Sequence, residues 1–97
     1  MSATTEDAWA YQVLSLARIE GGQLALPDEP LAELGRQIHE SADPRAAATA
    51  LIALATRLQA IPGARPVTNQ VCALAAIALG DAPLNAALCL ALYGGGG

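Results

Sequence analysis

The chain has 97 residues, with five arginines, no lysine, nine acidic side chains and a formal net charge of −4 at pH 7. A chain of this length makes one small domain that buries only about 60 to 65% of the surface exposed by its unfolded form. We therefore expect neither a second domain nor a deep catalytic cleft. The negative charge and the lack of a Lys/Arg stripe with interleaved aromatics disfavour direct nucleic-acid binding.

The charges divide the chain into two unlike halves. Eight of the nine acids lie between Glu6 and Asp43, whereas Asp81 is the single charged residue from Pro66 to Gly97. Hydrophobic residues make up 54% of the sequence, against roughly 45 to 50% in ordinary soluble domains. We expect the second half to be buried in the domain or against another protein.

The first half predicts two helices joined by an extended connector. Thr4 and Asp7 form a capping-box pattern, so a first helix should run over residues 4–20 and stop at the pair Gly21-Gly22. Residues 23–27 read as a strand-like connector, and a second helix follows over residues 29–41. The expected inward residues of these two helices are Trp9, Val13, Leu16, Ala17, Leu31, Leu34 and Ile38.

Three further helices complete the predicted fold. An Asp closely followed by a Pro marks a helix start at Asp28, Asp43 and Asp81, because the carboxylate can cap the first turn and Pro loses no helical hydrogen bond there. Helix three should cover residues 44–61, a central and almost wholly apolar helix four residues 67–79, and helix five residues 82–93. The core residues expected from helix three are Ala47, Leu51, Leu54, Leu58 and Ile61.

The sequence thus predicts an all-α fold, a compact bundle of about five short helices with a C-terminal apolar helical hairpin. Residues 1–93 should form the single domain, and residues 94–97, all glycine, a flexible tail. The apolar runs 71–79 and 84–92 are too short to span a membrane, which leaves a membrane-inserted hairpin as the less favoured alternative. The N-terminus lacks the basic and apolar regions of a secretory signal, so we expect a cytoplasmic location.

No arrangement of side chains predicts catalysis, a cofactor or a metal. Cys72 and Cys89 should lie at equal height in the C-terminal hairpin, as free thiols, or as a disulfide in an oxidising compartment. Together with the single His39 they lack the spacing of tetrahedral metal ligands. His39 and Ser41 are two positions apart and do not face each other on a helix, so no nucleophile and base can be paired. We expect a protein that is not an enzyme.

One helix face stands out as a candidate binding surface. Glu29, Glu33, Arg36 and Glu40 fall at i, i+4, i+7 and i+11 of helix two, and Asp28 extends the stripe. An ordinary solvated helix face is one interpretation of this pattern. The functional interpretation is a docking face for an Arg/Lys-rich protein surface, in which Glu33→Arg with Glu40→Arg would weaken binding more than tenfold.

These observations favour a non-catalytic, acidic, protein-binding module. Its size, acidity and lack of catalytic motifs are similar in profile to small phage-borne inhibitors, anti-CRISPR proteins among them. That resemblance implies an inhibitor that covers the basic, nucleic-acid-binding surface of a partner complex. The alternatives are a homo-oligomer, such as a homodimer, that buries surplus apolar surface, and a small-molecule-binding protein or enzyme with Trp9, Tyr11 or Tyr93 lining a pocket.

Overall fold

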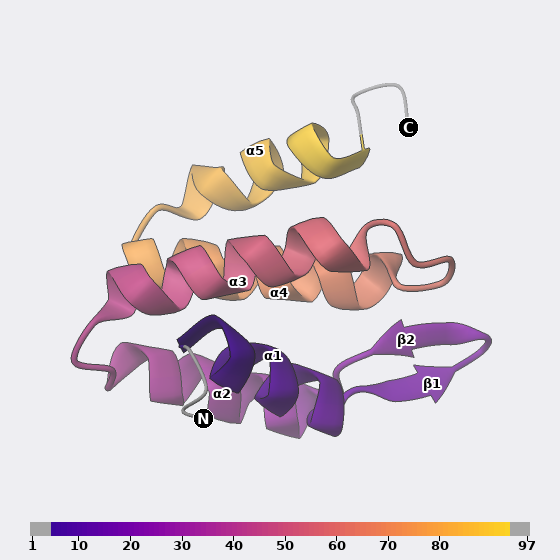
Figure 1. Ribbon diagram of the computed structural model, residues 1–97, viewed down its shortest axis with the longest axis horizontal. Coiled ribbons are helices and arrows are strands. Elements are labelled where there is room, and N and C mark those ends of the chain that lie inside the picture. The colour runs from indigo at the N-terminus through magenta and orange to yellow at the C-terminus, as the bar shows by residue number, and fades with distance from the viewer. Residues whose placement is uncertain (1–4, 94–97) are drawn as a thin grey trace.

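The computed structural model describes residues 5–93, and it describes side-chain environments for residues 8–92. This part of the chain forms five helices and one short hairpin: α1 (Thr5–Leu16), β1 (Arg18–Glu20), β2 (Gln23–Ala25), α2 (Asp28–His39), α3 (Pro44–Leu58), α4 (Arg65–Leu79) and α5 (Ala82–Tyr93). The helices lie in three layers, with α3 and α4 between α5 on one side and α1 and α2 on the other (Figure 1). The predicted all-α bundle is confirmed, with a small two-stranded sheet added at one end.

The hairpin corrects the prediction for helix one. α1 ends at Leu16, and residues 18–20 pair antiparallel with residues 23–25, with Ile19 opposite Leu24. Gly21 and Gly22 have φ angles of +60° and +80°, and a two-residue hairpin turn of type I′ needs positive φ at both central positions. The glycine pair is therefore a strand turn and not a helix stop, although the extended connector over residues 23–27 was foreseen.

The hairpin is fastened to the loop between α3 and α4. The Leu24 N–H donates to the carbonyl of Gly63 at 2.8 Å. Gly63 has a φ of +81°, and a Cβ placed there would lie 3.0 Å from the carbonyl oxygen of Gly22. Only glycine permits both this backbone conformation and this close approach.

α4 is the central helix, as predicted from its apolar surface. It packs against α2, α3, α5 and β2, while α1 packs chiefly on α3. The buried residues of α3 and α4 are Ala47, Ala48, Ala50, Leu51, Leu54, Ala55, Leu58, Val67, Thr68, Val71, Cys72, Leu74, Ala75 and Ala76. Thr68 is the one buried polar residue among these, and its hydroxyl donates to the carbonyl of Ala64 at 2.8 Å.

Two expectations about helix ends need correction. α3 stops at Leu58, with Gln59 as its C-cap, so Ile61 falls in the following loop and is 50% exposed instead of buried. Asp43 caps α3, accepting from the Ala46 N–H at 3.1 Å, as predicted. Asp28, by contrast, is the first residue of α2 after Pro27 and makes no capping hydrogen bond. Its carboxylate acts through its charge near the positive end of the helix dipole.

Two of the sequence predictions fall on residues that the structure does not describe. The capping box of Thr4 with the Asp7 side chain and the glycine tail over residues 94–97 lie outside the described residues. The described helices have at most 15 residues, and none is long and apolar enough to cross a membrane.

Candidate protein-binding surface

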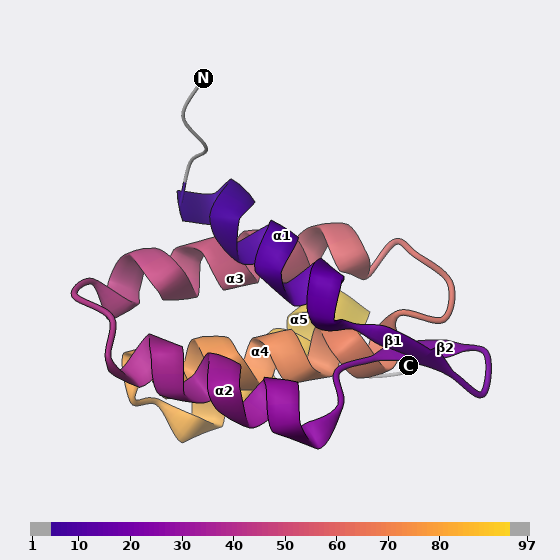
Figure 2. The ribbon, with the colours of Figure 1, turned by 90° about the horizontal axis from the view of Figure 1, so that it is seen from below.

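α2 lies on the outside of the molecule, in the layer opposite α5 (Figures 1 and 2). Leu34 and Ile38 are buried against the core and Leu31 is half-buried, as the sequence predicted. The opposite side of the helix carries the predicted partner-binding residues Asp28, Glu29, Glu33, Arg36 and Glu40. We call this set the α2 acidic face.

Three members of the α2 acidic face are joined into one network. The Arg36 guanidinium donates from Nε to Glu33 Oε2 at 3.0 Å and forms a second bond from Nη2 to Glu33 Oε1. Its Nη1 donates to Glu40 Oε2 at 2.7 Å. Arg36 therefore bridges two carboxylates that are about two helical turns apart, one on either side of it, and the three side chains together carry one net negative charge.

This network also reaches α1. Gln37 Nε2 donates to Glu33 Oε1 at 3.4 Å, and Gln12 Nε2 of α1 donates to Gln37 Oε1. The bond from Arg36, and then the one from Gln37, hold the pKa of the Glu33 carboxyl below its ordinary value. The same contact with Glu33 raises the pKa of Arg36. Glu33 is thus ionised and already neutralised within the domain.

Asp28 and Glu29 differ from the other acids of this face. Both are exposed in the first turn of α2, and among the described residues neither carboxylate makes a hydrogen bond or an ion pair. The helix dipole stabilises a negative charge at this position, by about 0.3–1 kcal/mol for an exposed residue. Within the α2 acidic face, these two carboxylates are the ones that have no internal partner among the described residues.

The start of α2 is fixed by an amide clamp from α4. Gln70 Oε1 accepts from the Leu26 N–H at 2.7 Å, and Gln70 Nε2 donates to the Leu26 carbonyl at 2.9 Å. Leu26 is buried, so its backbone groups cannot turn to water instead. The clamp holds the chain two residues before Asp28 and so places the unpaired carboxylates.

Two apolar hollows flank the α2 acidic face. One, which we call the acidic hollow because Glu29 and Glu33 line it, has a volume of about 650 Å³. It is lined by Leu16, Glu29, Pro30, Ala32, Glu33 and Arg36. A long cationic side chain can lay its apolar stem along such a surface while its charged end meets a carboxylate. Three of the five predicted partner-binding residues, Glu29, Glu33 and Arg36, therefore line the acidic hollow.

The second hollow, the α2–α4 groove, was not predicted. Its volume is about 500 Å³, and its lining residues are Asp28, Leu31, Ala32, Gly35, His39, Ala73, Leu74 and Ile77. Gly35 lines the groove, and a Cβ at that position would lie 4.0 Å from a Leu74 methyl carbon, in ordinary van der Waals contact. The spacing of Ala32 and Gly35 on one side of α2 was the available signal, but it does not reveal which helix lies opposite.

Other sequence candidates lie elsewhere. Glu20, the last residue of the predicted first helix, is instead exposed in β1. The side chains of Glu6 and Asp7 lie outside the described residues. Trp9 packs half-buried against the core, and Tyr11 is 78% exposed on α1. Neither of these aromatics lines the two hollows beside α2.

The two cysteines meet across the hairpin of α4 and α5, both as free thiols. Burial of Cys72, followed by the neighbouring Cys89 thiol, raises the pKa of Cys72 from 9.0 to about 11. The Cys89 thiol donates to Asn69 Oδ1 at 3.4 Å. Cys72 is therefore a neutral thiol at physiological pH. Among the described residues no three His, Cys, Asp or Glu side chains are grouped closely enough to hold a metal ion.

Comparison with known proteins adds no relative to this account. No family model, no curated protein and no solved structure matches the chain.

Proposed function

We propose that this protein is a non-catalytic binding module whose α2 acidic face docks onto an Arg/Lys-rich surface of another protein. The observation that carries the proposal is the pair of exposed carboxylates, Asp28 and Glu29, which have no hydrogen bond or ion pair among the described residues and lie at the edge of the two apolar hollows. Exposed carboxylates without internal partners keep their full attraction for a cation. The adjoining hollows supply apolar contact area, which an isolated charge cluster lacks.

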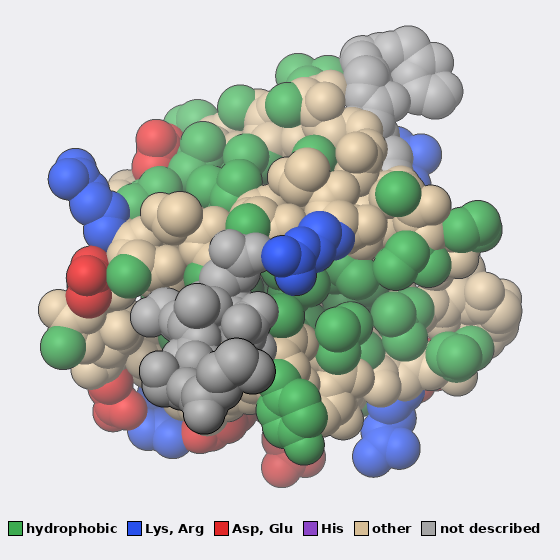
Figure 3. Space-filling model, viewed as in Figure 1, with side chains coloured by type: hydrophobic (Ala, Val, Ile, Leu, Met, Phe, Trp, Pro, Cys, Tyr) green, Lys and Arg blue, Asp and Glu red, His purple; other side chains and the backbone are tan. Residues whose placement is uncertain are grey.

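The distribution of charge supports a basic partner. The net charge of −4 speeds the encounter with a positive surface and disfavours negatively charged partners. Acidic side chains and arginines lie together along the lower edge of the molecule in Figure 3, over the layer that holds α2. Proteins that bind nucleic acid carry positive surfaces of the complementary kind. The proposed role is accordingly an inhibitor that covers such a surface, like the phage-borne inhibitors that it resembles in profile, acting in the cytoplasm.

The test uses a defined cationic probe. Backbone amide resonances of the protein are followed by NMR while a peptide of about nine arginines is added at low salt, where charge interactions reach about 10 Å or more. We expect shifts centred on the first turn of α2 and on Ala32. A matched peptide of glutamates is the control and should shift nothing. Shifts spread evenly over the surface, or centred away from α2, would refute the docking site.

A further inference from the structure

The outer face of α5 is apolar along its whole length. α5 contains no charged residue, and none of the residues 82–92 is fully buried. One side rests half-buried on α4 and consists of Leu84, Asn85, Leu88, Cys89 and Leu92. The other side is exposed and consists of Ala82, Pro83, Ala86, Ala87, Leu90 and Ala91, which we call the α5 stripe. The exposed side of a surface helix normally carries polar residues. The apolar α5 stripe is therefore a candidate contact surface for another molecule.

We propose that the α5 stripe is a contact between two copies of this protein, which pack α5 against α5 about a twofold axis. Each copy has a net charge of −4, so two copies repel wherever their acidic surfaces approach. The α5 stripe carries no charge and lies in the layer opposite α2 (Figure 1). Contact through α5 therefore keeps the α2 acidic faces of the two copies apart and leaves them free.

The arrangement of side chains on the α5 stripe suits an antiparallel pair. Leu90 is its one large side chain at 58% exposure, and alanines precede and follow it on the same side. With the twofold axis between Ala86 and Ala87, Leu90 of each copy lies level with Pro83 of the other, and small residues at the axis permit close approach. The two Asp81 side chains then lie at opposite ends of the contact, whereas a parallel pair would bring them together.

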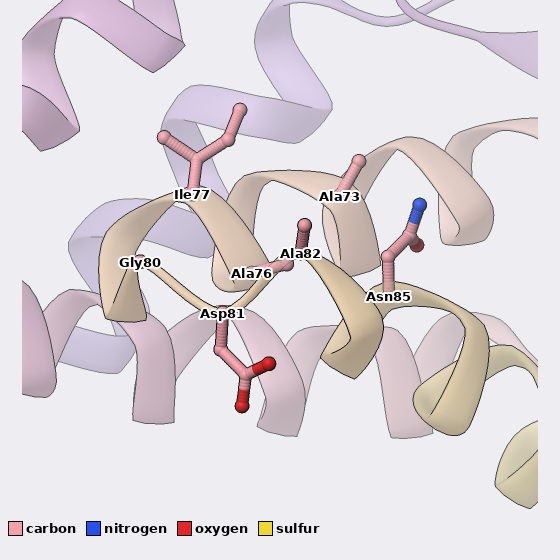
Figure 4. A pocket seen from close by; sticks show the side chains of 7 residues that line it. All are labelled: Ala73, Ala76, Ile77, Gly80, Asp81, Ala82 and Asn85. Atoms are coloured by element: carbon pink, nitrogen blue, oxygen red, sulfur yellow. The ribbon is translucent and has the colours of Figure 1, made fainter.

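A hollow beside the start of α5 extends this contact onto α4. Its volume is about 340 Å³, and it is lined by Ala73, Ala76, Ile77, Gly80, Asp81, Ala82 and Asn85. Figure 4 shows Ala73, Ile77 and Asn85 pointing to one side of the hairpin while the Asp81 carboxylate points away. Ile77 is 55% exposed there. Apolar surface thus continues from the α5 stripe onto α4. In the proposed pair, Leu90 of the second copy lies beside this hollow, level with Pro83.

The size of the α5 stripe sets the expected strength. A helix of 12 residues is about 18 Å long at ~1.5 Å per residue, so one helix pair covers a small area. Stable interfaces bury about 1,200–2,000 Å² in total, and this contact falls at or below the lower limit. We expect a reversible dimer with a dissociation constant of about 1–100 μM, in the range of weak contacts.

Sedimentation equilibrium of the full chain over a concentration series tests the proposal. Leu90→Glu places a charge in the α5 stripe, and Ala87→Glu places one beside the axis, where it meets its own copy. The matched control is Ile19→Glu, which changes the net charge equally at a residue that is 76% exposed on β1. All three sites are exposed, and circular dichroism checks that each variant is folded.

We expect a dimer in the wild type and in Ile19→Glu, with at least tenfold weaker association in Leu90→Glu and in Ala87→Glu. A wild type that stays monomeric at several hundred micromolar, well above the expected dissociation constant, would overturn the proposal. So would association that survives both α5 substitutions. Asp28 and Glu29 belong neither to the α5 stripe nor to the hollow beside it, although Ala73 and Ile77 line both that hollow and the α2–α4 groove. The substitutions in α5 leave the α2 acidic face unchanged, so the two tests can fail separately.

Discussion

Reversing the two unpaired charges, Asp28→Arg with Glu29→Arg, is expected to weaken binding of an arginine-rich peptide by more than tenfold. Each exposed charge pair contributes about 0.2–1 kcal/mol, and reversal replaces that attraction with a repulsion of similar size. Together the two sites lose about 0.8–4 kcal/mol, and the middle of that range, about 2.4 kcal/mol, exceeds the roughly 1.4 kcal/mol that corresponds to a factor of ten in the dissociation constant. Fluorescence anisotropy of a labelled peptide at low salt measures the change.

The control for this prediction is Glu20→Arg with Asp81→Arg. Each reversal adds two positive charges, so both double variants go from a net charge of −4 to zero. Glu20 and Asp81 are exposed and lie outside α2. Equal weakening in the two double variants would mean that net charge alone governs binding. That result would show that the α2 acidic face is not the docking site.

The sequence suggested Glu33→Arg with Glu40→Arg for this experiment, and the structure indicates why other substitutions are better. Glu33 and Glu40 are both paired with Arg36, so a partner must compete with an internal cation to reach them. Replacing them with arginines would also leave Arg36 beside two like charges and perturb the helix itself. Asp28 and Glu29 have no such internal partner among the described residues, which makes their substitution the cleaner test.

Gln70→Ala is expected to lower the free energy of unfolding by about 2–4 kcal/mol. The substitution removes both bonds of the amide clamp and leaves the buried N–H and carbonyl of Leu26 without a partner. An unsatisfied buried polar group costs about 1–3 kcal/mol, and here there are two. Urea denaturation followed by circular dichroism measures the loss, since the midpoint falls with stability.

Two further variants define what the clamp contributes. Gln23→Ala removes the same side chain at an exposed position in β2 and should change the free energy of unfolding by less than about 0.5 kcal/mol, as is usual for surface substitutions. Gln70→Glu can still accept from the Leu26 N–H but, when ionised, cannot donate to its carbonyl, so it should lie between wild type and Gln70→Ala. A Gln70→Ala protein as stable as Gln23→Ala would show that the clamp does not hold the start of α2.

Much of the fold could be read from helix periodicity. α5 was predicted to the residue, because Asp81 and Pro83 mark its start and its apolar run is unbroken. The inward residues Leu34, Ile38, Leu51 and Leu54 follow directly from a spacing of three or four. The hairpin was missed because Gly21-Gly22 suits a helix stop and a two-residue turn equally well. The choice depends on strand pairing and on the contact with Gly63, which are not local.

The binding surface shows the same division between local and non-local information. The sequence predicted that five side chains share one stripe of α2, and the structure leaves Asp28, Glu29, Arg36 and Glu40 exposed and Glu33 half-buried, with Asp28 beside a different hollow from Glu29. The sequence could not show that Arg36 neutralises Glu33 and Glu40, since the choice of side-chain rotamers decides that contact. It also could not show the α2–α4 groove or the exposure of the α5 stripe, because periodicity defines the faces of a helix and leaves its neighbours open. From its apolar composition the second half of the chain was expected to be buried in the domain or against another protein, and composition alone could not show which.

The most direct measurement for the central claim is capture of a partner from extract of the source organism or its host. Wild type, Asp28→Arg with Glu29→Arg, and Glu20→Arg with Asp81→Arg serve as three baits, and the bound proteins are identified by mass spectrometry. The account predicts one stoichiometric partner with a basic surface on the wild type and the control. That partner should be released near 1 M salt, where screening acts within about 3 Å, and should be missing from the α2 variant. Recovery of the same proteins by all three baits, or of the bait alone, would contradict it.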